Sequence, residues 1–390
     1  MTSSPTDRDT AAPQPTGLRG FPPAPPTSVA VIRSLATGSP TQGYAQTDSA
    51  ERVAARFDDA AQAERIRRVY AKTTVENRHL AIDPLDNDFA EFSGRPDTIR
   101  ERMNLFYEHA APLAVDTARR ALGTQTPDDV GQLVFVTSTG FLAPGVDVAI
   151  VKALGLPATV SRVVVNFMGC AAAMNALRVA SDFVRAHPDR MSLMVCLELS
   201  SVNAVFSGDP NDVVISSLFA DGCGAALIGA SEVGHRLPAG NIVVRDTFAH
   251  LLDGAEDGIV LGVNANGITC ELAQSLPRYI VDGVAPVIDE VLRRNGIDRG
   301  EITHWAIHPG GPRIIESASE ALGLPPEASD ISWRVLAEHG NMLSVSLLFV
   351  LETLLAARSS GEAPETGLAF SFAPGVTVEG FLFDIIGHAS

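Results

Sequence analysis

The sequence predicts an α/β protein built from two similar halves. Short β-branched, apolar runs typical of strands alternate with longer stretches typical of helices, and this alternation recurs on both sides of a polar, glycine-containing region at residues 230–240. With 390 residues, 46% of them hydrophobic, the chain can form a large core. We therefore expect residues 29–235 and 236–390 to form two α/β halves, each with a largely parallel sheet.

The charge balance restricts the partners that this protein can take. Its 46 acidic and 29 basic side chains give a net charge of −17 and a pI near 4.9. A surface of this sign disfavours nucleic acid and anionic membranes, so an anionic ligand needs a local cluster of basic side chains. We therefore expect no nucleic-acid partner.

The cysteines and the hydropathy pattern indicate where the protein resides. Four widely spaced cysteines form neither a C-x-x-C pair nor a zinc-binding spacing, which suits reduced thiols better than disulfides. Residues 1–9 lack the apolar core of a signal peptide, and no apolar run is long enough to span a bilayer. We expect a cytoplasmic protein with no metal and no membrane insertion. The cysteines are Cys170, Cys196, Cys223 and Cys270.

The elements of the first half follow from their local patterns. Residues 1–28 are rich in proline, which predicts a disordered or extended arm. Pro112 predicts a kink or restart within a helix. We expect strands at 29–32, 133–137 and 193–197, helices at 49–71, 97–121 and 146–154, and a turn into a strand at 218–228.

One predicted helix carries a basic face. Arg65, Arg68 and Lys72 are spaced i, i+3 and i+7 at the end of the helix predicted at 49–71, so they share one side of it. Taken alone, this pattern is most often an ordinary solvated face. In a chain this acidic, the same pattern also provides a candidate site for an anionic ligand.

The second half repeats the alternation. Strand patterns and helix patterns follow each other to the C-terminus, which suggests an internal duplication too diverged to read directly. We expect strands at 242–248, 258–263 and 302–308, helices at 276–295 and 341–357, and two closing strands at 367–372 and 379–386.

Cys170 stands where a strand turns into a helix. The apolar, β-branched run that begins at Val163 predicts a buried strand, and the alanine-rich stretch that follows Cys170 predicts a helix through Val184. Gly169 allows a tight bend between them. A cysteine at a helix N-terminus faces unpaired N–H groups and the positive end of the helix dipole, which favours the nucleophilic thiolate. A free cysteine that fills the core is an equally common outcome.

Two later segments end in residues that can complete a site around this cysteine. His308 closes an apolar strand before a Pro-Gly-Gly turn, and α/β folds gather catalytic groups at strand ends. Asn341 precedes an apolar helix, where it can also serve as a plain N-cap. Together, Cys, His and Asn can form a thiolate–imidazolium pair with an amide donor beside it, which suits attack on thioesters and stabilisation of an enolate. The local signatures of papain-like proteases are absent.

Three segments resemble the signature segments of type III polyketide synthases, the chalcone-synthase-like condensing enzymes. They are Gly169-Cys170, Ile307-His308-Pro309-Gly310-Gly311-Pro312 and Gly340-Asn341-Met342. The resemblance extends from about residue 25 to the C-terminus. It implies a thiolase fold, in which two duplicated halves stack as α-β-α-β-α layers, and a homodimer.

The resemblance also implies roles for single residues. Cys170 matches the family's nucleophile, His308 and Asn341 match its catalytic histidine and asparagine, and Phe219 matches a gatekeeper phenylalanine. Its basic residues for the phosphates of coenzyme A correspond to Arg65, Arg68 and Lys72.

Departures from the plant-type pattern bear on the substrate. Cys270 replaces a second gatekeeper phenylalanine, Asn203 replaces a threonine, and Leu343 replaces a serine; the Gly-Phe-Gly-Pro-Gly loop becomes Ser-Phe-Ala-Pro-Gly at 371–375. The loss of a ring at Cys270 opens the cavity and argues against a bulky aromatic starter.

Two stretches, Val163–Asn175 and Leu251–Leu272, resemble the long-chain α-pyrone synthases of the family. This resemblance implies a tunnel for a long acyl chain, with its mouth near Thr139, Ser200 and Ala204.

The implied reaction joins a medium- or long-chain fatty acyl-CoA starter to malonyl-CoA by decarboxylative Claisen condensation and gives alkyl α-pyrones, with coenzyme A thioesters as substrates and no bound cofactor. An alkylresorcinol-type synthase, which closes the ring by aldol condensation, remains an alternative. A ketoacyl synthase III-like enzyme is disfavoured because Pro-Gly-Gly follows His308, and a thiolase because no cysteine follows Cys270. A non-catalytic acyl-CoA or lipid binder would have no use for a reactive cysteine.

Overall fold

A computed structural model describes residues 28–86, 98–206, 209–264, 267–358 and 363–387. Its core is one nine-stranded sheet with the order β11-β12-β13-β8-β1-β7-β6-β4-β5. The first half supplies β1 (Ser28–Gly38), β4 (Val130–Thr137), β5 (Ser161–Asn166), β6 (Met191–Leu199) and β7 (Asp221–Glu232). The second half supplies β8 (Ile242–Leu251), β11 (His304–Ile307), β12 (Glu365–Ala373) and β13 (Thr377–Ile385).

The strand directions correct one prediction. Only the pairs β4–β5, β4–β6 and β11–β12 are parallel, and the remaining five neighbouring pairs are antiparallel. The expectation of a largely parallel sheet in each half is therefore wrong. One cause is visible at β12 and β13, which a short turn joins, since a tight hairpin imposes antiparallel pairing. The two halves meet where β1 pairs with β8.

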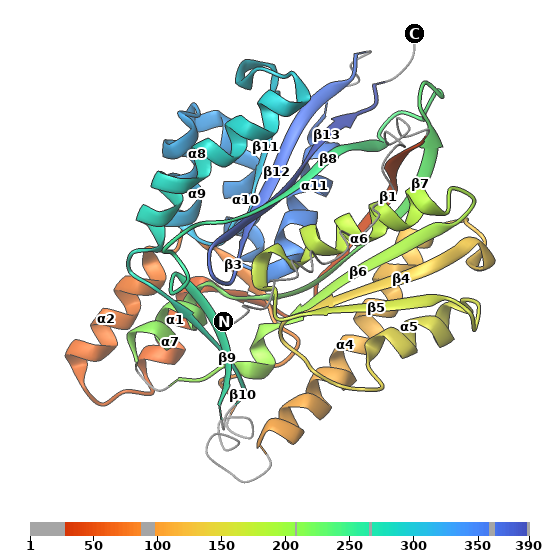
Figure 1. The fold of residues 1–390 in the computed structure, drawn as a ribbon. Helices are drawn as coiled ribbons and strands as arrows, with labels where there is room; N and C mark the ends of the chain where they lie inside the picture. The colour runs from red at the N-terminus through yellow and green to blue at the C-terminus, as the bar shows by residue number, and fades with distance from the viewer. Residues whose placement is uncertain (1–27, 87–97, 207–208, 265–266, 359–362, 388–390) are drawn as a thin grey trace, which may run out of the picture.

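Helices complete a five-layer stack, as the predicted thiolase fold requires. The outer layer of the first half contains α4 (Thr98–Leu122) and α5 (Val146–Leu154), and that of the second half contains α8 (Leu276–Asn295) and α9 (Pro312–Leu322). Between them lie α6 (Ala172–Ala186) and α11 (Ser346–Ala357), which contact strands of both halves. Figure 1 shows these layers from α4 and α5 at lower right to α8 and α9 at upper left.

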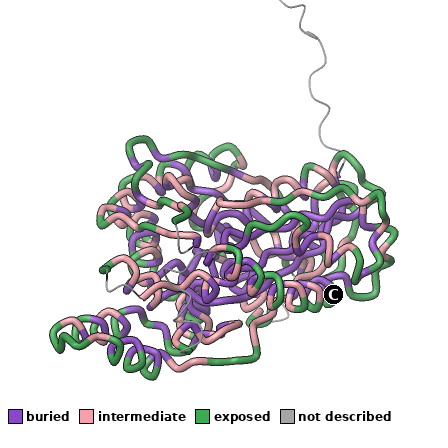
Figure 2. The backbone as a smooth tube through the Cα atoms, turned by 90° about the horizontal axis from the view of Figure 1, so that it is seen from below, coloured by how far each residue is buried: buried purple, intermediate pink, exposed green. Residues whose placement is uncertain are grey.

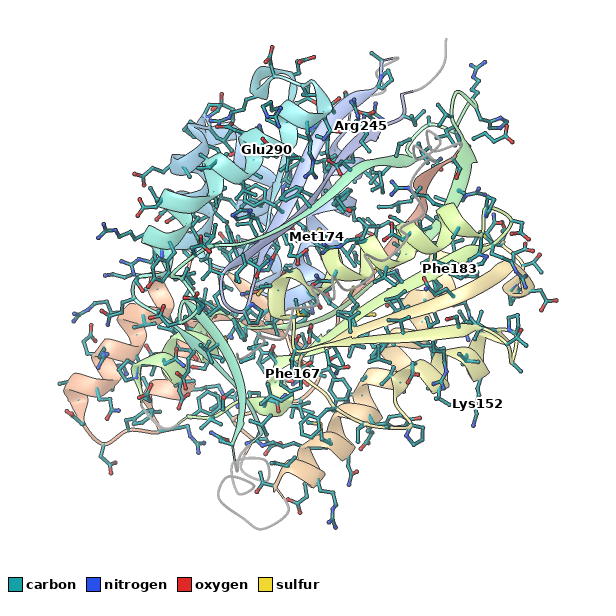
Figure 3. The ribbon with its side chains drawn as sticks, viewed as in Figure 1. Lys152, Phe167, Met174, Phe183, Arg245 and Glu290 are labelled. Atoms are coloured by element: carbon teal, nitrogen blue, oxygen red, sulfur yellow. The ribbon has the colours of Figure 1, made fainter. Side chains whose placement is uncertain are left out.

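The central layer holds the core that joins the halves. One hydrophobic cluster contains residues of α6 and α11 together with side chains from strands of both halves, including Met174 at the centre of the molecule (Figure 3). Figure 2 shows buried backbone concentrated through the middle of the fold. The two central helices are therefore fixed by packing on both faces.

Several helices differ from the predictions in where they begin, end or are interrupted. The helix expected at 49–71 is two helices, α1 (Gln46–Ala54) and α2 (Ala60–Ala71), because Asp59 caps a new start by accepting a hydrogen bond from the Ala61 N–H. The helix around Pro112 continues without a restart, since it runs unbroken over Thr98–Leu122. The helix expected at 341–357 begins only at Ser346, after a 3₁₀ turn at Leu343–Val345.

Other elements lie outside the predictions altogether. The pattern analysis did not identify α7 (Pro210–Leu218), α9, α10 (Asp330–His339), β10 (Gly267–Leu272) or the short pair β2 (Gly43–Ala45) and β3 (Asn77–His79). The strand β9 (Ile259–Asn264), which was expected, pairs with β10 as a separate hairpin. The proline-rich arm falls almost wholly outside the described residues.

The strand that leads to Cys170 is less buried than its composition suggests. β5 is the last strand of the sheet, and Val164 is 49% exposed in the single chain. The expectation of a buried strand at this place is wrong for the isolated chain, because one edge of β5 has no neighbouring strand among the described residues.

Leu177 tests how far stability depends on the central layer. It is 1% exposed on α6, so Leu177→Ala should lower the free energy of unfolding by about 2–5 kcal/mol through lost contacts and a cavity. Urea denaturation measures this loss. Leu251→Ala is the matched control, since Leu251 is 52% exposed and its loss should cost less than about 1 kcal/mol. Equal costs for the two would contradict the central role of α6.

Candidate active site

The turn that carries Cys170 is built by unusual backbone angles. After β5 ends at Asn166, Phe167 and Gly169 both have positive φ, of 58° and 56°, which reverses the chain within a few residues. A Cβ on Gly169 would also lie 3.2 Å from Pro374 Cδ. Cys170 therefore stands in a 3₁₀ turn directly before α6, as the sequence predicts.

His308 is held by the end of β11. Its backbone N–H donates to the Phe370 carbonyl across the sheet, and its ring is buried, with 2% of the residue exposed. Neither ring nitrogen has a hydrogen-bond partner among the described residues. Both nitrogens are therefore available to a substrate or to a transferred proton.

Asn341 is fixed by its backbone and its side chain. Its N–H donates to Leu218 O and its carbonyl accepts from the Ala220 N–H, so that it forms a parallel bridge with Phe219. The side-chain oxygen accepts from the Leu343 N–H, and Nδ2 donates to Gly310 O over 3.1 Å. The amide also lies near the Cys170 thiol and acts to lower its pKa.

These residues converge on one small cavity. Cys170, His308 and Asn341 line a space of about 40 Å³ together with Phe219, Cys270 and Leu343. The remaining walls are almost entirely apolar, including Leu261, Leu272, Ile314 and Phe372. The structure thus brings together the three predicted catalytic residues and both gatekeeper positions, although their roles stay predictions.

The protonation states correct one expectation. Burial, with smaller contributions from Cys270 and Glu198, raises the pKa of the Cys170 thiol, against the opposing effect of Asn341. Burial also lowers the pKa of His308 to about 3. At neutral pH the ligand-free site therefore holds a thiol and a neutral imidazole, because desolvation outweighs the helix dipole that was expected to favour the thiolate.

A second, larger cavity lies against the first. It has a volume of about 920 Å³, and its walls include Phe219, Cys270 and Leu343, which also line the small cavity. The three residues predicted for the tunnel mouth, Thr139, Ser200 and Ala204, belong to the walls of the large cavity, as does Asn203. Phe219 and Cys270 therefore lie where the two cavities adjoin, and their role as gatekeepers stays a prediction.

The predicted basic face lies apart from both cavities. Arg65, Arg68 and Lys72 are exposed on α2, and none of them lines a cavity wall. The large cavity reaches the same helix at Tyr70, on its buried side. Arg67, by contrast, is occupied by ion pairs with Glu51 and Glu64.

Glu198 was missed by the sequence analysis. It is fully buried on β6 and accepts hydrogen bonds from the Ser138 N–H and from the hydroxyls of Thr139 and Ser344. Burial raises its pKa to about 7. The sequence did offer one signal, a single acidic residue within an apolar strand run. A carboxyl group is costly to bury unless it forms hydrogen bonds.

Glu198 predicts a pH dependence of stability. Between its ordinary pKa of 4.5 and about 7, the folded state keeps a proton that the unfolded state releases, so the contribution of Glu198 to the free energy of unfolding should fall as pH rises, by up to about 3 kcal/mol in all. The lowered pKa of His308 acts in the opposite direction below about pH 6.5, so the contribution of Glu198 is measured as a difference between variants. In urea denaturation between pH 5 and 8, Glu198→Gln should lose this contribution and the exposed Glu320→Gln should keep it. Identical pH profiles for the wild type and Glu198→Gln contradict the prediction.

Each helix in the described part of the chain is too short or too polar to span a bilayer.

Comparison with known proteins places the chain in a family. Residues 26–232 match the N-terminal domain of chalcone and stilbene synthases, and residues 244–387 match their C-terminal domain. The alpha-pyrone synthesis polyketide synthase-like Pks18 of Mycobacterium tuberculosis is 60% identical over 372 residues, or 95% of each chain.

Two crystal structures are similar across 92% of this chain and 99% of theirs. PKS-I from the brown alga Ectocarpus siliculosus is 39% identical with a TM-score of 0.84. The C-terminal type III polyketide synthase domain of Steely1, a type I/III hybrid from Dictyostelium, is 25% identical with a TM-score of 0.83. The chain thus belongs to the chalcone and stilbene synthase family, and it is a type III polyketide synthase, a decarboxylating condensing acyltransferase that uses coenzyme A thioesters such as malonyl-CoA.

Proposed function

We propose that this synthase joins a medium- or long-chain fatty acyl-CoA starter to malonyl-CoA and releases alkyl α-pyrones. The observation that carries the proposal is the cavity of about 920 Å³ behind Phe219 and Cys270. A cavity of that size suits a whole acyl chain, and a cysteine at one gatekeeper position leaves more room than a phenyl ring. The relative from Mycobacterium tuberculosis is named for alpha-pyrone synthesis, in agreement with this product.

The first step loads the starter onto Cys170. As the thiol attacks the thioester carbonyl of the acyl-CoA, a ring nitrogen of His308 accepts its proton. The tetrahedral intermediate collapses, coenzyme A leaves as its thiolate, and His308 returns the proton to it. Since neither nitrogen of His308 has a partner in the described part of the chain, the ring can perform both transfers without losing a bond.

The second step forms the carbon–carbon bond. Malonyl-CoA loses CO₂, and His308 and the Asn341 amide stabilise the resulting enolate by hydrogen bonds. Asn341 uses one Nδ2 hydrogen on Gly310 O, which leaves the other for Cys170 or the substrate. The enolate carbon attacks the Cys170 thioester, and the cysteine leaves as the extended chain passes to coenzyme A. Apolar walls strengthen these hydrogen bonds.

Ring closure ends the sequence. After two or three rounds, an enol oxygen of the poly-β-keto chain attacks the thioester carbonyl, the thiolate leaves, and a pyrone forms. Aldol closure to an alkylresorcinol would use a carbon nucleophile instead. Neither route needs a further cofactor.

We place the phosphates of coenzyme A on Arg65, Arg68 and Lys72. All three are exposed on α2, and none has an ion-pair partner among the described residues. The proposed location is the cytoplasm, where the four cysteines would stay reduced.

A ladder of acyl-CoA starters tests the reaction. With malonyl-CoA and purified protein, mass spectrometry should show alkyl pyrones with the highest kcat/KM for medium or long starters. Cys170→Ala should abolish them, because the variant lacks the thiol that lies beside His308 and Asn341. Resorcinols in place of pyrones would establish the aldol route, and products from short or aromatic starters alone would refute the acyl cavity.

The gatekeeper position tests the role of the large cavity. Cys270→Phe places a ring between the two cavities, so kcat/KM for long starters should fall about tenfold or more relative to short starters. Cys270→Ser is the matched control and should keep the wild-type preference, since its volume hardly changes. An unchanged preference in Cys270→Phe would contradict passage of the chain at this point.

We further propose that the protein is a homodimer joined at β5. The open edge of β5 exposes Val164, and the loop after β4 exposes Phe141 and Leu142 at 38% and 37%. Asn166 ties the end of β5 to this loop through a hydrogen bond to Gly140 O. An apolar surface of this kind on a sheet edge is unfavourable in water and suits a second copy.

A charge on β5 tests this interface. Val164→Asp should convert a dimer into a monomer in size-exclusion chromatography with light scattering, because an aspartate would be desolvated there. Val233→Asp is the control, since Val233 is 63% exposed in the connection between β7 and β8 and should leave the mass unchanged. A wild-type protein that runs as a monomer would refute the proposal.

A further inference from the structure

The helix α7 connects the gate to the catalytic residues. Its C-terminal end leads into Phe219, whose neighbours Leu218 and Ala220 share backbone hydrogen bonds with Asn341. Its N-terminal end carries Asn211, whose side chain reaches β10 beside Cys270. The helix is roughly 13 Å long, so both gatekeeper positions are attached to one short rigid element.

Asn211 binds the edge of β10 as a neighbouring strand would. Its Nδ2 donates to the Cys270 carbonyl over 2.6 Å, and its Oδ1 accepts from the Leu272 N–H over 3.3 Å. In an antiparallel pair, the carbonyl of one residue and the N–H of the second residue after it point to the same side. The carboxamide of Asn211 thus takes the place of a neighbouring strand on the edge of β10 that faces away from β9.

The hairpin needs such an anchor because it belongs to no larger sheet. β9 and β10 pair only with each other among the described strands. At the other end of β10, the Ile268 N–H donates to Asn203 Oδ1 over 3.3 Å. Asn203 also donates to Thr139 O, on the wall of the large cavity. Two asparagines therefore hold the outer edge of β10, and Asn211 is the one next to Cys270.

We propose that Asn211 is a positioning residue that sets the opening between the acyl cavity and the catalytic cavity, and thereby the range of starters that reach Cys170. It fixes Cys270 relative to α7, and α7 fixes Phe219. This inference rests on the proposed acyl-CoA starter and extends it to a specificity determinant. Since the hydrogen bonds of Asn211 end on backbone atoms, its effect does not depend on the side chain at position 270.

Two variants separate positioning from simple stability. Asn211→Ala removes both hydrogen bonds. Asn211→Asp keeps the size of the side chain, keeps an acceptor for the Leu272 N–H and places an acid in the first turn of a helix, which favours folding. The carboxylate cannot donate to the Cys270 carbonyl and repels it. Asn241→Ala is the control, since Asn241 holds a carbonyl at Pro238, outside the walls of both cavities.

The experiment compares kcat/KM across the acyl-CoA ladder for each variant and for the wild type. Release of CO₂ from malonyl-CoA without a starter is measured in parallel. Asn211→Asp and Asn211→Ala should reduce the ratio of kcat/KM between the best and the poorest starter about fivefold or more, because a loosened β10 widens the opening. Release of CO₂ should stay within about twofold of the wild type, since the contacts of Asn341 at the other end of α7 persist.

A second measurement does not depend on condensation. Labelling of Cys170 by N-alkyl maleimides of increasing length, followed by peptide mass spectrometry, should depend on alkyl length in the wild type and lose part of that dependence in Asn211→Asp. The acyl-CoA ladder of the wild type alone tests the proposed starter, whereas the comparison of Asn211→Asp with the wild type tests the role of Asn211. That role is refuted if Asn211→Asp keeps the wild-type length preference in both measurements. It is also refuted if the variant loses CO₂ release and condensation to the same extent.

Discussion

The site depends on the burial of α6 and α11 between the two halves of the sheet. Both helices pack on both faces, so neither can shift without opening the central core. Cys170 precedes the first of these helices, and Asn341 lies a few residues before the second. The hydrophobic packing of the middle layer therefore determines the distance between the proposed nucleophile and the proposed amide donor, which are far apart in the sequence.

The same burial governs the electrostatics. Apolar walls keep water from Cys170 and His308, which raises the pKa of the thiol and lowers that of the imidazole. A site that disfavours charge at rest also strengthens each hydrogen bond to a charge that forms during a reaction. The same apolar environment thus sets the resting protonation states and strengthens the hydrogen bonds of the reaction. At a helix N-terminus near the surface, the helix dipole would instead have favoured the thiolate of Cys170.

The sequence predicted those parts of the site that local chemistry determines. The strand, turn and helix around Cys170 and the strand end at His308 follow from residue patterns within a few positions. Strand direction did not, because three of the antiparallel pairs, β1–β7, β1–β8 and β8–β13, join strands far apart in the sequence. Glu198 accepts hydrogen bonds from two distant segments, at residues 138–139 and at Ser344, and Asn211 binds backbone atoms of a hairpin that has no strong pattern of its own. Side-chain bonds to distant backbone leave no periodic signal.

The bridge between Phe219 and Asn341 makes the two sides of the proposed gate unequal. The backbone on either side of Phe219 is hydrogen-bonded to Asn341, a proposed catalytic residue, so any movement there disturbs Asn341. The backbone at Cys270 belongs to a hairpin that pairs with no other described strand. The hairpin side can therefore change shape without moving Asn341, whereas the Phe219 side cannot, so substitutions in β10 are the less costly way to alter which substrates enter.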